Sequence, residues 1–133
     1  MATCGRDPQR LARLRERLSG DPQPHLIEQV DLADLTATRD FAEQAINQFG
    51  HVDVLVNNAA TAPLAPFGEI GADTFEQTLS TNIRVTFYLT QRIWQQMIQQ
   101  GGGVIVNISS LAAIDPFPGF SIYGASKAWL DLM

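Results

Sequence analysis

Short apolar runs alternate along this chain with longer segments in which apolar residues recur at helical spacing. Three runs have the length and composition of strands: HLIEQVD at 25–31, VDVLV at 52–56 and VIVNI at 104–108. The last two are continuous enough to predict buried strands of a parallel sheet. Four segments predict helices: residues 8–18, 35–49, 73–100 and 122–133. This alternation predicts an α/β fold with a doubly wound parallel sheet, covered by helices on both faces.

The ends of these helices are marked by residues with a known capping preference. Asp7 and Asp34 are suited to cap the first two helices at their N-termini, and Pro8 suits a first turn. Gly50 is placed to end the second helix, and Gly101 the third. We therefore expect the helices to begin and end close to these positions.

Composition narrows the classes of protein that the chain can represent. With 133 residues, of which 45% are hydrophobic and 17% charged, the chain predicts one globular domain at most. A net charge of −5 argues against nucleic-acid binding. The single cysteine, Cys4, fits a reducing compartment. No signal-peptide pattern and no run long enough for a membrane span are present, so we expect a cytoplasmic protein.

The chemistry of the chain gathers between Ser110 and Lys127. If residues 122–133 are helical, Tyr123 and Lys127 lie one turn apart on one face, where the ammonium favours the phenolate. Lowering the pKa of a tyrosine from about 10 to about 7.5 takes roughly 3–4 kcal/mol. One positive charge about 4 Å away supplies roughly 1 kcal/mol in water and about 4 at an effective dielectric of 20. The pair therefore predicts a proton donor and acceptor in a partly dry pocket, where Ser110 could hold a substrate oxygen.

The spacing Ser-x12-Tyr-x3-Lys, preceded by VIVNIS, resembles the active-site segment of the short-chain dehydrogenase/reductase family. Three more landmarks of that family stand upstream in the expected order: Asp31-Leu32, Asn57-Asn58-Ala59 and Asn82. The resemblance implies a Rossmann-like fold and hydride transfer between NAD(P) and a secondary alcohol or ketone. It also implies a homodimer or homotetramer, and it includes no metal.

The resemblance assigns roles to individual residues. It implies that the catalytic residues are Asn82, Ser110, Tyr123 and Lys127. It implies cofactor contacts from Arg6, Asp31, Leu32, Asn58, Ala59, Tyr123 and Lys127. Since a basic residue after the second strand binds the 2′-phosphate of NADP in the family, Arg6 favours NADP over NAD. Ala60 departs from the family, which has glycine there.

Plainer interpretations of these residues stay open. Arg6 could be a surface arginine, and Asp31 could be a strand-end aspartate. Asn82 could be a helix asparagine bonded to a preceding carbonyl, a common fate for this residue type. In the family, the asparagine at this place distorts its helix and holds a water in a proton relay to the lysine.

The resemblance covers essentially all of residues 1–133, but these match the middle of a family domain. The chain has no G-x-x-x-G-x-G turn, which relatives carry in their first strand–helix unit and which binds the cofactor pyrophosphate. We therefore expect a domain truncated at both ends and an isolated chain without dehydrogenase activity. Two alternatives remain. One is an inactive fragment that associates through its long helices, and the other is an extended-branch epimerase or dehydratase, against which Asn57-Asn58-Ala59 and Asn82 argue.

Overall fold

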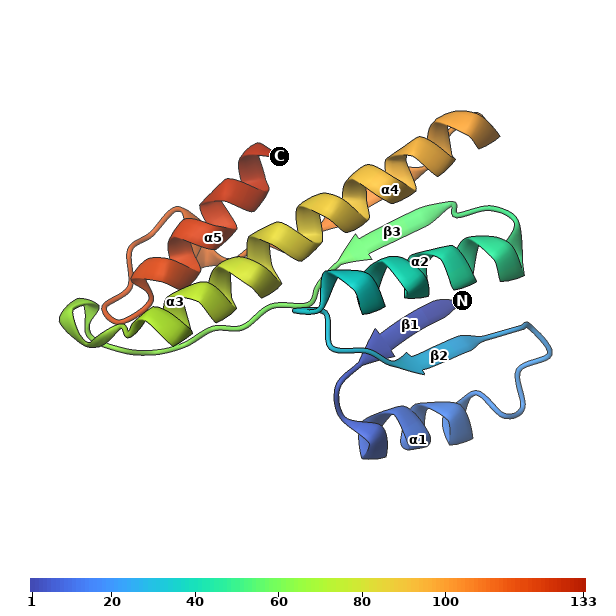
Figure 1. The fold of residues 1–133 in the computed structure, drawn as a ribbon, viewed down its shortest axis with the longest axis horizontal. Helices are drawn as coiled ribbons and strands as arrows, with labels where there is room; N and C mark the ends of the chain where they lie inside the picture. Colours follow the sequence, from blue (N-terminus) through green and yellow to red (C-terminus); the bar gives the residue numbers. More distant parts are fainter.

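The computed structural model describes residues 1–133 and contains four strands and five α-helices. In chain order these are β1 (Ala2–Gly5), α1 (Pro8–Arg17), β2 (Leu26–Gln29), α2 (Leu35–Phe49), β3 (Val54–Asn57), α3 (Ala72–Leu79), α4 (Val85–Gln100), β4 (Val104–Asn107) and α5 (Ser121–Leu132). Short 3-10 turns lie at Phe67–Glu69 and Leu111–Ala113. The predicted alternation of strand and helix is confirmed (Figure 1).

The strands form two separate parallel pairs. β1 pairs with β2, from Ala2 opposite Leu26 onward, and β3 pairs with β4, from Val54 opposite Val104 onward. β2 and β3 are therefore not neighbours, and the prediction that residues 25–30, 52–57 and 104–109 form adjacent strands is wrong for the first of them. β1 and β3 each have one hydrogen-bonded neighbour, so each leaves one edge free. In Figure 1, α2 is drawn between these two edges.

The helix ends follow the local capping chemistry. The Asp7 carboxylate accepts hydrogen bonds from the backbone N–H groups of Gln9 and Arg10, and Asp34 does the same for α2. Gly50 ends α2 in the left-handed region, with φ of 75°, which a residue with a side chain adopts only with strain. These ends were predictable because each depends on residues within one turn.

The core lies between one face of the β3–β4 pair and the helices α2 and α4. Its centre consists of Ala42, Ile46, Ile93 and Met97. The residues that pack against this centre are Val52, Leu55, Leu89 and Ile105. Leu55 and Ile105 come from β3 and β4, so the inward residues of both strands contact the two helices.

The opposite face of the same two strands is uncovered. Val54, Val56, Val104 and Val106 expose 53%, 54%, 57% and 38% of their surface. The prediction that these strands are buried on both faces is wrong for this chain, because alternate side chains point to opposite faces and helices cover one of them.

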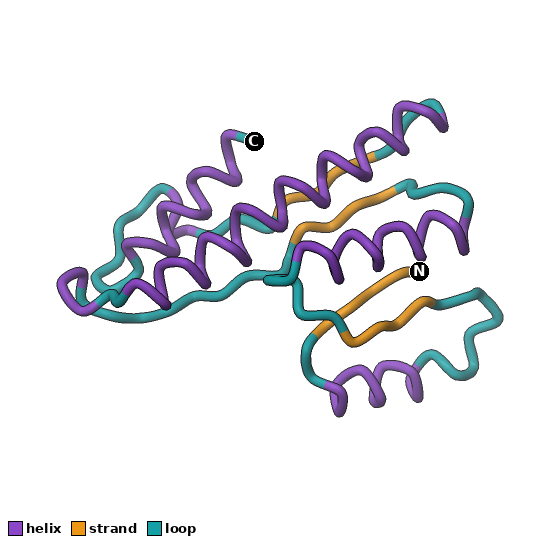
Figure 2. The backbone as a smooth tube through the Cα atoms, in the orientation of Figure 1, coloured by secondary structure: helices purple, strands orange, loops and turns teal.

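The helix predicted over residues 73–100 is continuous in path but interrupted in geometry. α3 and α4 are joined by a π-helical turn at Ser80–Arg84, and the three segments follow each other as one rod in Figure 2. Asn82 lies at the middle of this turn and is buried. A helix distortion at Asn82 was expected from the family resemblance, and it is present.

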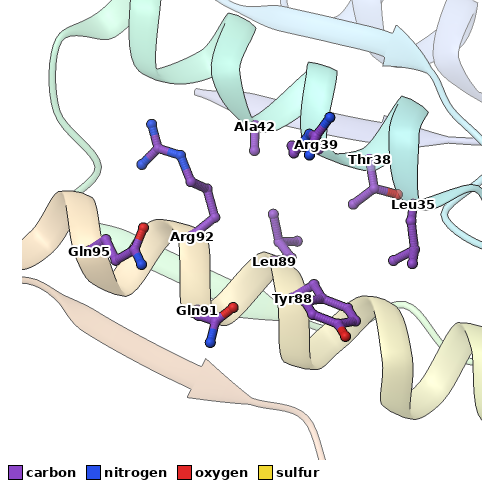
Figure 3. Close-up of a pocket in the computed structure, with 9 residues that line it drawn as sticks. All are labelled: Leu35, Thr38, Arg39, Ala42, Tyr88, Leu89, Gln91, Arg92 and Gln95. Carbon is purple, nitrogen blue, oxygen red and sulfur yellow. The ribbon is translucent and has the colours of Figure 1, made fainter.

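An ion pair joins α2 to α4 beside a shallow groove. The Arg92 guanidinium donates two hydrogen bonds to the Glu43 carboxylate, at 2.5 and 2.9 Å. The groove has a volume of about 340 Å³. Figure 3 shows the residues that line it: Leu35, Thr38, Arg39, Ala42, Tyr88, Leu89, Gln91, Arg92 and Gln95. None of the predicted site residues lines this groove. No helix in the structure combines the length and apolar character needed to cross a bilayer.

Candidate active site

Tyr123 and Lys127 occupy successive turns of α5, as their spacing predicts. The Lys127 ammonium lies 5.9 Å from the centroid of the Tyr123 ring. Lys127 exposes 4% of its surface, and its ammonium donates a hydrogen bond of 2.6 Å to the backbone carbonyl of Ile108. The charge is therefore held between the phenol and the end of β4, in the partly dry setting that the sequence argument requires.

Ser110 begins the turn that packs against this helix. Its hydroxyl caps the 3-10 turn Leu111–Ala113 by accepting a hydrogen bond of 3.2 Å from the Ala112 N–H. The turn approaches α5 so closely that a Cβ placed on Gly124 would lie 2.5 Å from the Ala112 carbonyl oxygen. Gly124 directly follows Tyr123, so the glycine allows the Ser110 turn to rest against the helix turn that carries the phenol.

Asn82 is bound to two other parts of the chain. Its side-chain oxygen accepts from the Thr61 N–H at 2.8 Å, and its amide nitrogen donates to the Thr61 carbonyl at 2.9 Å. The same nitrogen donates to the Ser126 hydroxyl, also at 2.9 Å. The plainer interpretation of Asn82, a bond to a preceding helical carbonyl, is wrong. The structure brings Asn82 to the helix of Tyr123 and Lys127.

The asparagines after β3 have different surroundings. Asn57 is buried, and its amide nitrogen donates to Asn107 Oδ1 and to Thr90 Oγ1, each at 2.9 Å. Asn57 therefore ties the neighbouring strands β3 and β4 together. Asn58 and Ala59 are exposed at the carboxyl end of β3, where a ligand could approach their backbone.

Arg6, Asp31 and Leu32 lie beyond the carboxyl ends of β1 and β2. Arg6 is exposed, and its backbone carbonyl accepts a hydrogen bond of 3.2 Å from the Gln29 amide. The Asp31 carboxylate accepts from the Ala33 N–H at 3.0 Å, which is a local turn contact. The labelled strands in Figure 1 all point toward the same side of the molecule, so these residues share that side with Asn58. None of the three makes a hydrogen bond to the residues around Tyr123.

The donors near Tyr123 could hold the nicotinamide half of NAD(P). A lysine ammonium has three N–H donors, and Lys127 uses one of them, on Ile108. A buried ammonium with spare donors matches the paired hydroxyls of a ribose. The Ser109 hydroxyl and the Thr61 hydroxyl are also buried without a hydrogen-bond partner in the same region. Unpaired buried polar atoms of this kind are costly unless a bound molecule or water satisfies them.

Sequence reasoning missed several residues that hold this site together. Ser126, Thr61, Thr90 and Asn107 all take part in its hydrogen bonds. For Asn107 a signal was present, because it occupies the same place in VIVN as Asn57 does in VLVN, and the two prove to be opposite each other in the register. For Ser126 and Thr61 there was no periodic signal, since their partners lie 44 and 21 residues away from them.

In a parallel α/β fold ligands bind at the carboxyl ends of the strands, which is where this chain gathers its polar residues. All of residues 1–133 match the sequence model of the family described as short chain dehydrogenase, and the chain belongs to this family. Its fold is the Rossmann-like α/β fold of these proteins, and its relatives are reductases and dehydrogenases.

Individual relatives show how far the similarity extends. L-xylulose reductase of Mesocricetus auratus is 41% identical over 105 residues, which are 78% of this chain and 41% of the reductase. D-threitol dehydrogenase of Mycolicibacterium smegmatis is 36% identical over 114 residues, which are 86% of this chain and 44% of the dehydrogenase. The chain thus spans less than half the length of these two curated relatives.

Solved structures give the same result for the fold. A short chain dehydrogenase/reductase family protein superposes with a TM-score of 0.85 at 37% identity, over 98% of this chain and 53% of its own. The closed form of serine dehydrogenase complexed with NADP+ superposes with a TM-score of 0.87 at 28% identity, over 98% of this chain and 52% of its own.

Proposed function

We propose that the whole protein is an NAD(P)-dependent oxidoreductase that interconverts a secondary alcohol and a ketone, with Tyr123 as the proton donor and acceptor. The observation that carries this proposal is the buried Lys127 ammonium, 5.9 Å from the centroid of the Tyr123 ring. A positive charge at that place stabilises the phenolate, so the phenol can exchange a proton with a substrate oxygen.

The other residues complete the proposed chemistry. The bound cofactor supplies the carbon that gives or takes the hydride. Ser110 donates a hydrogen bond to the substrate oxygen and so orients it toward the Tyr123 hydroxyl. Lys127 stabilises the phenolate and binds the nicotinamide ribose with its remaining donors. Asn82 supports the water that passes a proton on from Lys127.

NADP is the proposed cofactor in preference to NAD. The support is the exposed guanidinium of Arg6, directly after β1, where it can bind the 2′-phosphate. Asp31 and Leu32 contact the adenine, and the backbone of Asn58 and Ala59 borders the adenosine. Two relatives carry the same cofactor in their names, carbonyl reductase [NADPH] 2 of Sus scrofa and the serine dehydrogenase complexed with NADP+.

The substrate is proposed by class alone, as a small ketone or secondary alcohol. In the sequence, Ile114, Phe117 and Phe120 flank the site, where they could line an apolar pocket or pack the loop. Ile114 and Phe117 are exposed, at 78% and 43%. The similar reductase and dehydrogenase are named for L-xylulose and D-threitol, which carry several hydroxyl groups. A polyhydroxy substrate would hydrogen-bond Ser110 and Tyr123 equally well, so both kinds belong in the assay.

Assembly into a homodimer or homotetramer is also proposed. Phe87, Trp94 and Ile98 form an apolar stripe along α4, and they expose 43%, 54% and 58% of their surface. Residues seven and eleven positions apart share one side of a helix, so a second copy could cover all three together. A cytoplasmic location stays a prediction from the sequence.

The test is made in the whole protein with NADPH, a panel of ketones and polyhydroxy ketones, and cofactor absorbance as the readout. Tyr123→Phe should abolish turnover while cofactor affinity stays nearly unchanged, because the aromatic ring remains and the hydroxyl that exchanges a proton with the substrate is removed. Lys127→Ala should reduce both turnover and cofactor affinity. Near-normal turnover in Tyr123→Phe would rule out the proposed mechanism. The isolated 133-residue chain serves as a negative control, since we expect it to bind no pyrophosphate.

A further inference from the structure

Ser126 is one of the two most deeply buried polar residues in the molecule, with 1% of its surface exposed. Its hydroxyl donates a hydrogen bond of 2.7 Å to the backbone carbonyl of Tyr123. The same hydroxyl accepts a hydrogen bond of 2.9 Å from the side-chain amide of Asn82. Both capacities of the hydroxyl are therefore used, one on the turn that carries the phenol and one on a different element.

Asn82 is a rigid partner for this contact. Two hydrogen bonds hold its side chain to the backbone of Thr61, and the π-helical turn Ser80–Arg84 surrounds it. Ser126 thus connects α5 to the loop after β3 through a single buried amide. A hydroxyl bound to a fixed amide has one favourable position, so it also fixes the carbonyl to which it donates.

The first turn of α5 packs against its neighbours through Ile122, which is buried, but it makes few hydrogen bonds to other elements. The residue at its N-cap, Phe120, makes no side-chain hydrogen bond to the helix. Tyr123 is the third residue of α5, within the turn where the backbone N–H groups lack helical partners. Lys127 is anchored one turn further on, to the carbonyl of Ile108. Without Ser126, the Tyr123 turn would keep its packing contacts, such as those of Ile122 and of Gly124 with Ala112, but would lose its hydrogen-bonded link to Asn82.

We propose that Ser126 is a positioning residue that fixes the Tyr123 phenol relative to Lys127 by linking the Tyr123 carbonyl to Asn82. Its bearing on catalysis rests on the function proposed above. Ser126 contacts neither substrate nor cofactor in this role. It acts through the backbone of Tyr123, and Asn82 acts on the same helix through Ser126.

Thr78 provides a matched comparison within the same chain. It is buried to the same extent, with 1% of its surface exposed, and α3, which carries it, packs against α5. Its hydroxyl donates to the carbonyl of Thr74 within its own helix, at 2.8 Å. Thr78→Val therefore removes an equally buried hydroxyl hydrogen bond without releasing α5 from another element, whereas Ser126→Ala releases it.

The first measurement uses the 133-residue chain and requires no turnover. The chain has two tyrosines, so a Tyr88→Phe background leaves Tyr123 as the only tyrosine whose ring gives an NMR signal. Ser126→Ala should shift that ring signal, because the ring moves relative to the ammonium that lies 5.9 Å from its centroid. Thr78→Val should leave the ring signal unchanged. Ser126→Thr, which keeps the hydroxyl, should restore it.

The second measurement uses the whole protein. Ser126→Ala should lower kcat by about tenfold to a hundredfold, with the KM for the cofactor within about twofold of the original value. In the double variant Ser126→Ala/Asn82→Ala, kcat should fall by less than the product of the two factors measured for the single variants, since both changes break one link. If Ser126→Ala does not fold, Ser126→Cys replaces it, because the thiol fills the space of the hydroxyl and is only a weak donor.

The outcomes separate the two proposals. An unchanged Tyr123 ring signal in Ser126→Ala, or an equal shift of that signal in Thr78→Val, overturns the positioning role. If kcat in the double variant with Asn82→Ala falls by the full product of the two single factors, the two residues do not act through one link. If the whole protein turns over no ketone or alcohol, the proposed function fails, and the NMR signal of the Tyr123 ring in the chain still decides whether Ser126 places the phenol.

Discussion

The close approach of the Ser110 turn to α5 predicts a specific consequence for Gly124→Ala. The added methyl group would lie 2.5 Å from the Ala112 carbonyl oxygen, about 0.9 Å short of the 3.4 Å at which ordinary contact begins. The obstacle is backbone, so a side-chain rotation cannot remove it. Either the turn Leu111–Ala113 or the first part of α5 must move by a substantial fraction of an ångström.

Two opposing effects decide the stability of this variant. Alanine is favoured over glycine within a helix by about 1 kcal/mol. Overpacking a close contact costs about 1–3 kcal/mol. The net change in the free energy of unfolding should therefore lie between zero and about 2 kcal/mol of destabilisation. The effect on turnover should be larger, because a misplacement of about 1 Å between reacting groups can cost about a hundredfold.

Urea unfolding of the chain measures the first effect, and turnover of the whole protein measures the second. Ala125→Gly is the matched control, since Ala125 is the next residue of α5 and is exposed. That change should destabilise by about 1 kcal/mol through helix propensity alone. If Gly124→Ala instead stabilises the chain by about that amount and leaves turnover intact, the turn does not press on the helix and the reasoning is refuted.

Three further predictions concern other parts of the molecule. Arg6→Ala should weaken NADP binding to the whole protein about tenfold to a hundredfold through loss of a charged phosphate contact. Cofactor titration measures this, and an equal loss for NAD would contradict it. Burial raises the pKa of the Cys4 thiol from 9.0 to about 11, so at pH 8 the thiol of the folded chain should react with a disulfide reagent about a hundredfold more slowly than that of the unfolded chain. Equal rates would show that Cys4 is not shielded. The hydrogen bond from the Arg92 guanidinium lowers the pKa of Glu43 from its ordinary 4.5, so the pair stabilises the fold fully above that pH and loses its effect as the pH falls further. Glu43→Gln should thus lower the free energy of unfolding by about 0.5 kcal/mol near neutral pH, a small value because solvent screens the pair, and by little in acid. A loss that stays constant from pH 7 downward would contradict this.

The sequence was informative wherever structure depends on near neighbours. Asp7 and Asp34 cap helices through bonds to residues two and three positions ahead, so the helix starts were predictable. The spacing of Tyr123 and Lys127 likewise fixed their common face once α5 was expected to be helical.

What the sequence could not supply depends on residues far apart in the chain. The uncovered face of Val54 and Val56 depends on which helices lie against the sheet, and an apolar run does not carry that information. The role of Ser126 depends on Asn82, and that of Asn82 depends on Thr61. A short polar side chain acquires such a role only when the fold brings it to a partner.

The division of the strands into two pairs has a consequence for local opening. α1 packs on β1 and β2, and the hydrogen bonds of this N-terminal unit stay within it, from the pairing of Ala2 with Leu26 to the contact of Val30 N–H with the Gly5 carbonyl. The unit can therefore unfold cooperatively by itself. Its amide protons should exchange with solvent through a subglobal opening that leaves β3, β4 and the Tyr123 helix folded. Arg6, Asp31 and Leu32 all border this unit, so any ligand that bridges them to Asn58 would slow exchange across both units at once.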